Sequence, residues 1–128
     1  MSEPGAAAAE ALAASSSALA DEDRAYIESE GWVPPPIVRA AILARALVVH
    51  FAEIPAEERG AILSVAERFM VTGDDGDKAA VATGFLEALA NAGDRSEIDM
   101  DRLWSELGEE SKAYLRAWDE FNGITPRP

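Results

Sequence analysis

Apolar side chains recur along most of the chain at the three- and four-residue intervals of amphipathic helices. The clearest case is a helix that begins near Pro55, whose inward face is predicted to consist of Ile62, Val65, Ala66, Phe69 and Met70. Residues 36–52 are apolar around most of a helical circumference, which is typical of the central helix of a bundle. Arg39 and His50 fall on the narrow polar stripe of that helix. No segment alternates with period two for long enough to be a strand.

Glycine, proline and aspartate residues set the limits of the other helices. We predict helices over residues 18–30 and 36–52, from Pro55 to Thr72, from the Gly73–Asp77 loop to Asn91, from Asp99 to Leu107 and from Gly108 to Gly123. An aspartate of the Gly73–Asp77 loop and Asp99 are expected as N-caps. The side chains predicted to face inward in the last three helices are Val81, Phe85, Leu86, Leu89, Leu103, Trp104, Leu107, Tyr114, Leu115, Trp118 and Phe121. The expected fold is therefore all-α, a single irregular bundle of five or six helices.

The start of the chain differs in composition from the rest. Residues 1–17 are mostly alanine and serine, with Leu12 as the one large apolar side chain after the first residue. Such a segment buries too little surface to offset the entropy of ordering it. We therefore expect a disordered tail over 1–17, a helical domain over 18–124 and a short C-terminal tail over 125–128.

The charge balance restricts the classes of partner. The chain has 24 acidic residues against 11 lysines and arginines, a net charge of −13, so its surface repels phosphate and anionic lipid. We expect neither nucleic acid nor a membrane as a partner. A basic protein would be attracted, although acidity is also a common means of keeping a protein soluble.

Several chemistries lack the residues that they need. The chain has no cysteine and a single histidine, His50, which excludes disulfides, thiolate sites and two-histidine metal centres. The acidic loop around Gly76 does not match a calcium-binding loop, because Gly73 and Ala82 stand where two of its ligands belong. We predict no catalytic residue, no cofactor and no metal site. With no secretory signal or membrane span recognisable, we expect a cytoplasmic protein.

An aromatic and acidic group near the C-terminus is the least ordinary feature of the sequence. Tyr114, Trp118 and Phe121 share one helical face, which packing in the core would explain. Tyrosine and tryptophan are also frequent anchors of protein interfaces, and acidic neighbours would complement a basic partner. The candidate interface residues are Trp104, Glu109, Glu110, Tyr114, Trp118, Asp119, Glu120 and Phe121.

The segment from Leu107 to Gly123 resembles the closing segment of a family of short bacterial proteins of unknown function. The shared pattern is leucine, glycine, two variable residues and serine, then an arginine-alanine-tryptophan-aspartate block and a phenylalanine; Val81–Glu87 resembles the family's middle helix. The likeness runs over roughly residues 55–128. It implies an all-helical domain and an association with toxin or defence loci, and it brings no catalytic residues.

Three functions remain open. The first is a non-catalytic protein-binding domain, of the type that neutralises a basic toxin as an immunity protein or antitoxin does. The second is a small-ligand-binding or enzymatic helical domain that uses buried carboxylates with Arg39 or Arg45 in an apolar pocket. The third is a structural subunit or a homodimer.

Overall fold

The computed structural model describes residues 3–127, and all regular secondary structure among them is helical. The elements are α1 (Ala6–Ala13), α2 (Ser17–Glu30), α3 (Pro36–Val49), α4 (Ala56–Thr72), α5 (Asp75–Ala79), η1 (Ala80–Leu86), α6 (Glu87–Asp94), α7 (Met100–Glu106) and α8 (Glu109–Phe121). Because α5, η1 and α6 follow one another without a break, they form one continuous rod, and the described residues contain seven helical segments. The all-α prediction is confirmed, with one more helix than expected.

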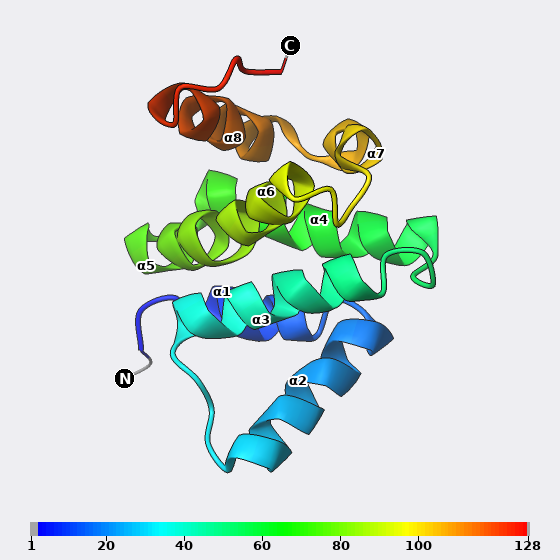
Figure 1. Ribbon diagram of the computed structural model, residues 1–128. Helices are drawn as coiled ribbons and strands as arrows, with labels where there is room; N and C mark the ends of the chain where they lie inside the picture. The colour runs from blue at the N-terminus through cyan, green and yellow to red at the C-terminus, as the bar shows by residue number, and fades with distance from the viewer. Residues whose placement is uncertain (1–2, 128) are drawn as a thin grey trace.

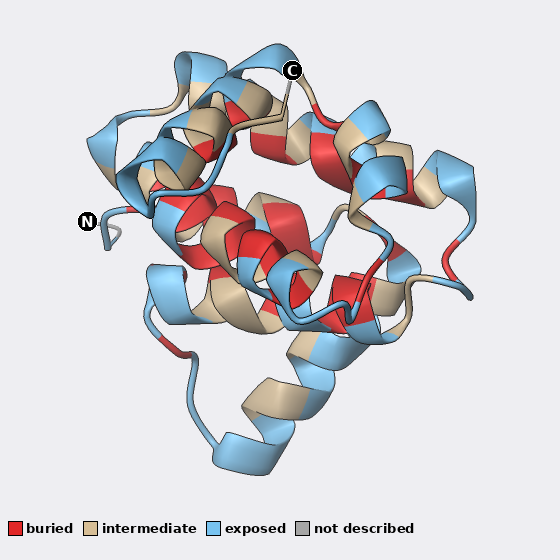
Figure 2. Ribbon diagram, turned by 45° about the horizontal axis from the view of Figure 1, so that its top comes forward, coloured by how far each residue is buried: buried red, intermediate tan, exposed pale blue. Residues whose placement is uncertain are grey.

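The continuous rod lies in the middle of the molecule. Figure 1 shows α4 beside it, α7 and α8 on one side of this pair, α1 and α3 on the other, and α2 slanting away at the far end. The π-helical segment η1 packs most extensively on α3, and Val81, Phe85, Leu86 and Leu89 are fully buried. Their predicted inward orientation is therefore confirmed. Figure 2 shows the buried residues gathered on the central helices, whereas α2 is mostly exposed.

Helix α1 contradicts the prediction of a disordered tail for residues 3–17. Ala8, Ala9 and Leu12 are fully buried, and α1 packs against α3, α4 and α5. Alanine side chains allow neighbouring helix backbones to approach closely, so a helix with few large apolar groups still completes a core. Met1 and Ser2, the first residues of the expected tail, lie outside the described residues.

Gly5 and Gly76 make this close approach possible, because an added Cβ atom at Gly5 would lie 2.8 Å from the carbonyl oxygen of Gly76. A Cβ atom added at Gly76 would lie 2.7 Å from the Cβ of Pro4, closer than such atoms approach in real structures. The backbone N–H of Ala8 donates a hydrogen bond of 3.3 Å to the Asp77 carboxylate. Since Ala8 lies in the first turn of α1, where backbone N–H groups lack partners within the helix, Asp77 caps α1 from the neighbouring helix.

The polar stripe of α3 faces α2. Arg39 forms two hydrogen bonds with Asp23, of 2.8 and 2.7 Å, and His50 lies 3.0 Å from Glu22. The two stripe residues that the sequence placed on one side of this helix therefore both contact the acidic helix α2. These polar contacts hold α2, in which Leu19 is the only buried residue.

The predicted aspartate caps are confirmed. Asp74 accepts a hydrogen bond from the Asp77 N–H at the start of α5, and Asp99 accepts one from the Arg102 N–H at the start of α7. Ser16, which the sequence analysis assigned to the tail, caps α2 by accepting a hydrogen bond from the Leu19 N–H. No helix among residues 3–127 has the length and apolar character to cross a membrane.

Candidate functional site

Helix α8 carries most of the predicted interface residues, and a carboxylate from α4 fixes its start. Glu67 accepts hydrogen bonds from the backbone N–H of Glu110 (2.8 Å), the backbone N–H of Ser111 (3.0 Å) and the Ser111 hydroxyl (2.9 Å). Gly108 at the N-cap position has no side chain to make these bonds itself, and a Cβ atom there would collide with the Glu67 carboxyl group. The glycine therefore leaves the space that a distant acid fills.

The hydrogen bonds to Glu67 also change its acidity. Burial by itself raises the pKa of the Glu67 carboxyl, but the three hydrogen bonds favour the ionised form and outweigh burial. The pKa of Glu67 therefore lies below its ordinary value of 4.5. A negative charge is thus retained at the positive end of the α8 dipole.

The inner face of α8 is bound to the central rod. Ser111 and Leu115 are buried, and the Tyr114 hydroxyl donates a hydrogen bond to the Glu87 carboxylate on α6. Burial, together with the hydrogen bond and the negative charge of Glu87, raises the pKa of Tyr114 to about 12. Tyr114 therefore stays protonated and acts as a hydrogen-bond donor between the two helices.

The opposite face of α8 is exposed. We call Glu110, Ala113, Ala117, Glu120 and Phe121 the outer strip of α8, because all five are exposed and lie on one side of the helix. Phe121 has 85% of its surface exposed, so its predicted position in the core is wrong. It is the last residue of α8, and the chain turns away through Gly123, so no element of residues 3–127 covers the ring. The outer strip therefore consists of two glutamates and two alanines, with one large aromatic side chain at its end.

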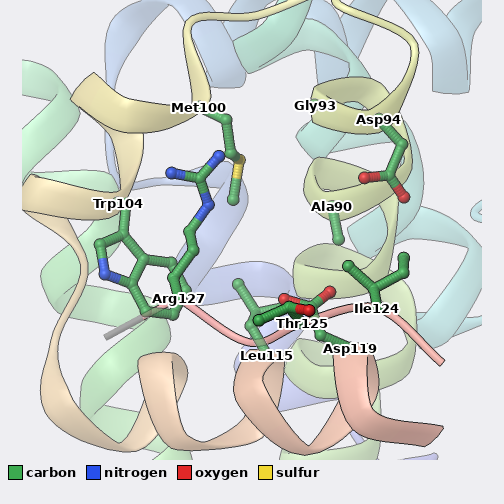
Figure 3. A pocket seen from close by; sticks show the side chains of 10 residues that line it. All are labelled: Ala90, Gly93, Asp94, Met100, Trp104, Leu115, Asp119, Ile124, Thr125 and Arg127. Carbon is green, nitrogen blue, oxygen red and sulfur yellow. The ribbon is translucent and has the colours of Figure 1, made fainter. Parts of the chain in front are cut away.

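A pocket of about 200 Å³ lies between α6, α7, α8 and the C-terminal segment (Figure 3). Asp94 reaches it from α6, Trp104 from α7 and Asp119 from α8, while Arg127 crosses it from the C-terminal segment. The guanidinium of Arg127 forms an ion pair with Asp101 on α7. The pocket therefore combines carboxylates, one guanidinium and an aromatic ring.

The environment of the pocket changes the pKa of the Asp119 carboxyl group. Burial raises the pKa of Asp119, and the negative charge of Asp94 raises it further, while Arg127 acts in the opposite direction. The net effect is a pKa above the ordinary value of 3.8. The sequence placed Asp119 among the candidate interface residues, whereas the structure brings it into the lining of the pocket together with Asp94.

The eight candidate interface residues are thus divided among three environments. Glu109, Glu110, Glu120 and Phe121 are exposed; Tyr114 and Trp118 are half-buried against the core; Trp104 and Asp119 line the pocket. They form no single surface. The separation arises because an aromatic residue at helical spacing is buried only where another element lies opposite it.

Sequence reasoning missed a buried arginine. Arg59 is only 4% exposed and binds Glu106 through hydrogen bonds of 3.1 and 2.8 Å and the Ile54 carbonyl oxygen through one of 2.8 Å. Its guanidinium also lies 4.7 Å from the centre of the Phe51 ring. These contacts join α4 to α7 and to the preceding turn, so the role of Arg59 is structural.

The two arginines of the small-ligand hypothesis occupy other positions. Arg39 is bound to Asp23, and Arg45 is exposed and bound to Glu97. Neither lines the pocket of Figure 3. Among residues 3–127, no three histidine or acidic side chains come together as a metal site would need.

These features define an all-helical domain with a C-terminal helix that is anchored by cross-helix carboxylate contacts and exposed on its outer side. The chain belongs to the family described as "Domain of unknown function (DUF7674)", which it matches over residues 10–123. The match begins within α1, so the family unit includes part of the segment expected as a tail. No curated protein and no solved structure matches the chain.

Proposed function

We propose that this protein is a non-catalytic binding domain that presents the outer strip of α8 to a basic protein partner. The single observation that carries the proposal is the exposure of Phe121 beside Glu120 on a helix whose inner face is firmly held. A large aromatic side chain left 85% exposed has no packing role in the isolated chain. Phenylalanine, like the other aromatic residues, is enriched at protein interfaces.

The anchoring of α8 supports this proposal. Glu67 fixes its start and Glu87 holds its middle, so the outer strip is ordered before any partner arrives. A preorganised surface loses less conformational entropy on binding than a mobile one does. The two glutamates of the outer strip, Glu110 and Glu120, favour a basic partner, as does the net charge of −13.

The resemblance to short bacterial proteins associated with toxin loci supports one class of basic partner. We propose that the partner is a toxin and that binding neutralises it, as an immunity protein or antitoxin does. Such a role needs no catalytic group in this chain.

Site-specific photocrosslinking in the native cells tests the proposal. A photoreactive phenylalanine analogue is placed at position 121, and at position 25 on α2 as a control, because Ala25 is exposed at the far end of the molecule. We expect an adduct with a basic protein from position 121 and none from position 25. The absence of a specific adduct, or an adduct of two copies of this chain, would contradict the proposal.

Binding of the purified partner then measures the contribution of each side chain. Phe121→Ala is expected to raise the Kd at least about tenfold, because interface anchors contribute more than a kcal/mol. Glu120→Lys is expected to weaken binding most at low salt. Glu28→Lys on α2 is the matched control and should leave the Kd unchanged, and an unaltered Kd for Phe121→Ala would refute the assignment of the surface.

A further inference from the structure

We propose that the pocket between α6, α7 and α8 binds one organic cation, an alkylguanidinium or alkylammonium group. The pocket is separate from the outer strip of α8, so this inference does not depend on the proposed function. The charges, the walls and the size of the pocket all favour such a ligand.

The carboxylates of the pocket are incompletely paired. Among residues 3–127, the hydrogen bonds and ion pairs of the side chains include neither the Asp94 nor the Asp119 carboxylate. Within the described part of the chain, Arg127 is the only basic residue in the lining, and it pairs with Asp101. The exposed Asp94 and the half-buried Asp119 therefore line a cavity whose one cation is shared with a third acid, Asp101.

The walls favour a cation that carries an alkyl chain. In Figure 3, Trp104 and Asp94 stand on opposite sides of the pocket, with Leu115 and Asp119 near its lower end. The guanidinium of Arg116 already lies 5.5 Å from the centre of the Trp104 ring, which shows that this ring accepts a cation as a neighbour. The apolar side chains of Met100, Trp104 and Leu115 in the lining contact the alkyl chain, and the carboxylates bind the charged end.

The size of the pocket limits the ligand. A volume of about 200 Å³ is below the range of roughly 300–1,000 Å³ that accommodates drug-sized ligands. One amino-acid side chain or a small free amine is the appropriate size. The two sources share the same chemistry, a single positive group on a short apolar stem.

The electrostatic state of Asp119 is consistent with such a ligand. Its pKa is raised by burial and by Asp94, so bringing both carboxylates into the pocket as anions is unfavourable. An added positive charge relieves that repulsion. Arg127 relieves it in part and therefore competes with an external cation for the same charges.

Titrations of the full chain followed by NMR test the proposal. Propylguanidinium is compared with propylurea, which has nearly the same shape and no charge. We expect saturable shifts of the Trp104 indole N–H with propylguanidinium, with a Kd on the order of 1 mM as befits so small a ligand, and none with propylurea. Equal shifts with both compounds, or no saturable shift, would overturn the proposal.

Two variants with opposite expected effects identify the site. Asp94→Asn combined with Asp119→Asn should raise the Kd roughly tenfold, whereas Arg127→Gln should lower it roughly threefold by removing the competing cation. Glu28→Gln is the matched control because Glu28 is an exposed acid on α2 and does not line the pocket. An unchanged Kd in the double variant, or weaker binding in Arg127→Gln, would contradict the assignment.

A further titration distinguishes the sources of the cation. Nα-acetyl-arginine amide carries the same guanidinium on a peptide backbone. Binding as tight as that of propylguanidinium indicates an arginine side chain of another protein, and binding of propylguanidinium alone indicates a free small molecule. Binding of neither compound would refute the site.

Discussion

Helices α1 and α8 show opposite relations between the size of a side chain and its burial. In α1, the small residues Ala8 and Ala9 are fully buried together with Leu12, whereas in α8 the large Phe121 is 85% exposed. Helix α1 lies among α3, α4 and α5, while the end of α8 has no element over its outer side. The position of neighbouring helices, rather than the hydrophobicity of a residue alone, decides which side chains are buried.

The two helices nevertheless begin in a similar way. Asp77 accepts a hydrogen bond from the Ala8 N–H of α1, and Glu67 accepts hydrogen bonds from the Glu110 and Ser111 N–H groups of α8. In both cases an acid from another helix binds N–H groups of the first turn. The start of α8 is held by more and shorter bonds, whereas α1 is held mainly by its buried apolar face.

Of the changes that test this comparison, truncation of the buried leucine of α1 should lower the free energy of unfolding the most. We expect Leu12→Ala to lower the free energy of unfolding by about 2–5 kcal/mol, because it leaves a cavity in the core. Phe121→Ala, which removes a larger side chain, should change it by less than about 0.5 kcal/mol. Urea denaturation measures both, and equal effects of the two substitutions would invalidate the comparison.

Removal of the acid that caps α8 should have an intermediate effect. Glu67→Ala is expected to destabilise the protein by about 0.5–2 kcal/mol, the usual range for the loss of a helix cap. Glu120→Ala removes an exposed acid from the other end of the same helix and serves as the control. Thermal and urea denaturation provide the measurement, and a Glu67→Ala protein as stable as the control would show that the cap contributes nothing.

The smallest expected effect is a difference between the wild type and Glu67→Gln in how stability depends on pH. Because the pKa of Glu67 is lower in the folded than in the unfolded chain, its contribution is present above the ordinary value of 4.5 and is lost as the pH falls through the folded pKa. We therefore expect the wild type to lose stability relative to Glu67→Gln on acidification. Urea denaturation at a series of pH values tests this expectation, and parallel curves would contradict it.

The pKa of Asp119 is shifted in the opposite direction to that of Glu67. Its pKa is raised above 3.8 in the folded chain, so its contribution is fully present below the unfolded pKa and is lost as the pH rises through the folded pKa. The wild type should therefore gain stability relative to Asp119→Asn as the pH falls. The groups that face Asp119 are Asp94 and Arg127, and neither is changed in this variant.

The sequence by itself determined the helices that depend on local interactions. The aspartate caps of α5 and α7 and the entry to α3 at Pro36 all lie within one helical turn of the groups that they affect. The inward face of the central rod follows from the periodicity of its apolar residues. Such signals are readable because both partners are neighbours in the chain.

Only the tertiary structure decided the features that join distant segments. Glu67 caps a helix that begins more than forty residues later, α1 docks through close backbone contacts near Gly76, and Asp94 meets Asp119 across the pocket. These contacts depend on where helices cross, which no local pattern specifies. For the same reason, Phe121 is exposed although its helical spacing matches that of Tyr114 and Trp118, because burial requires a neighbouring helix opposite each position.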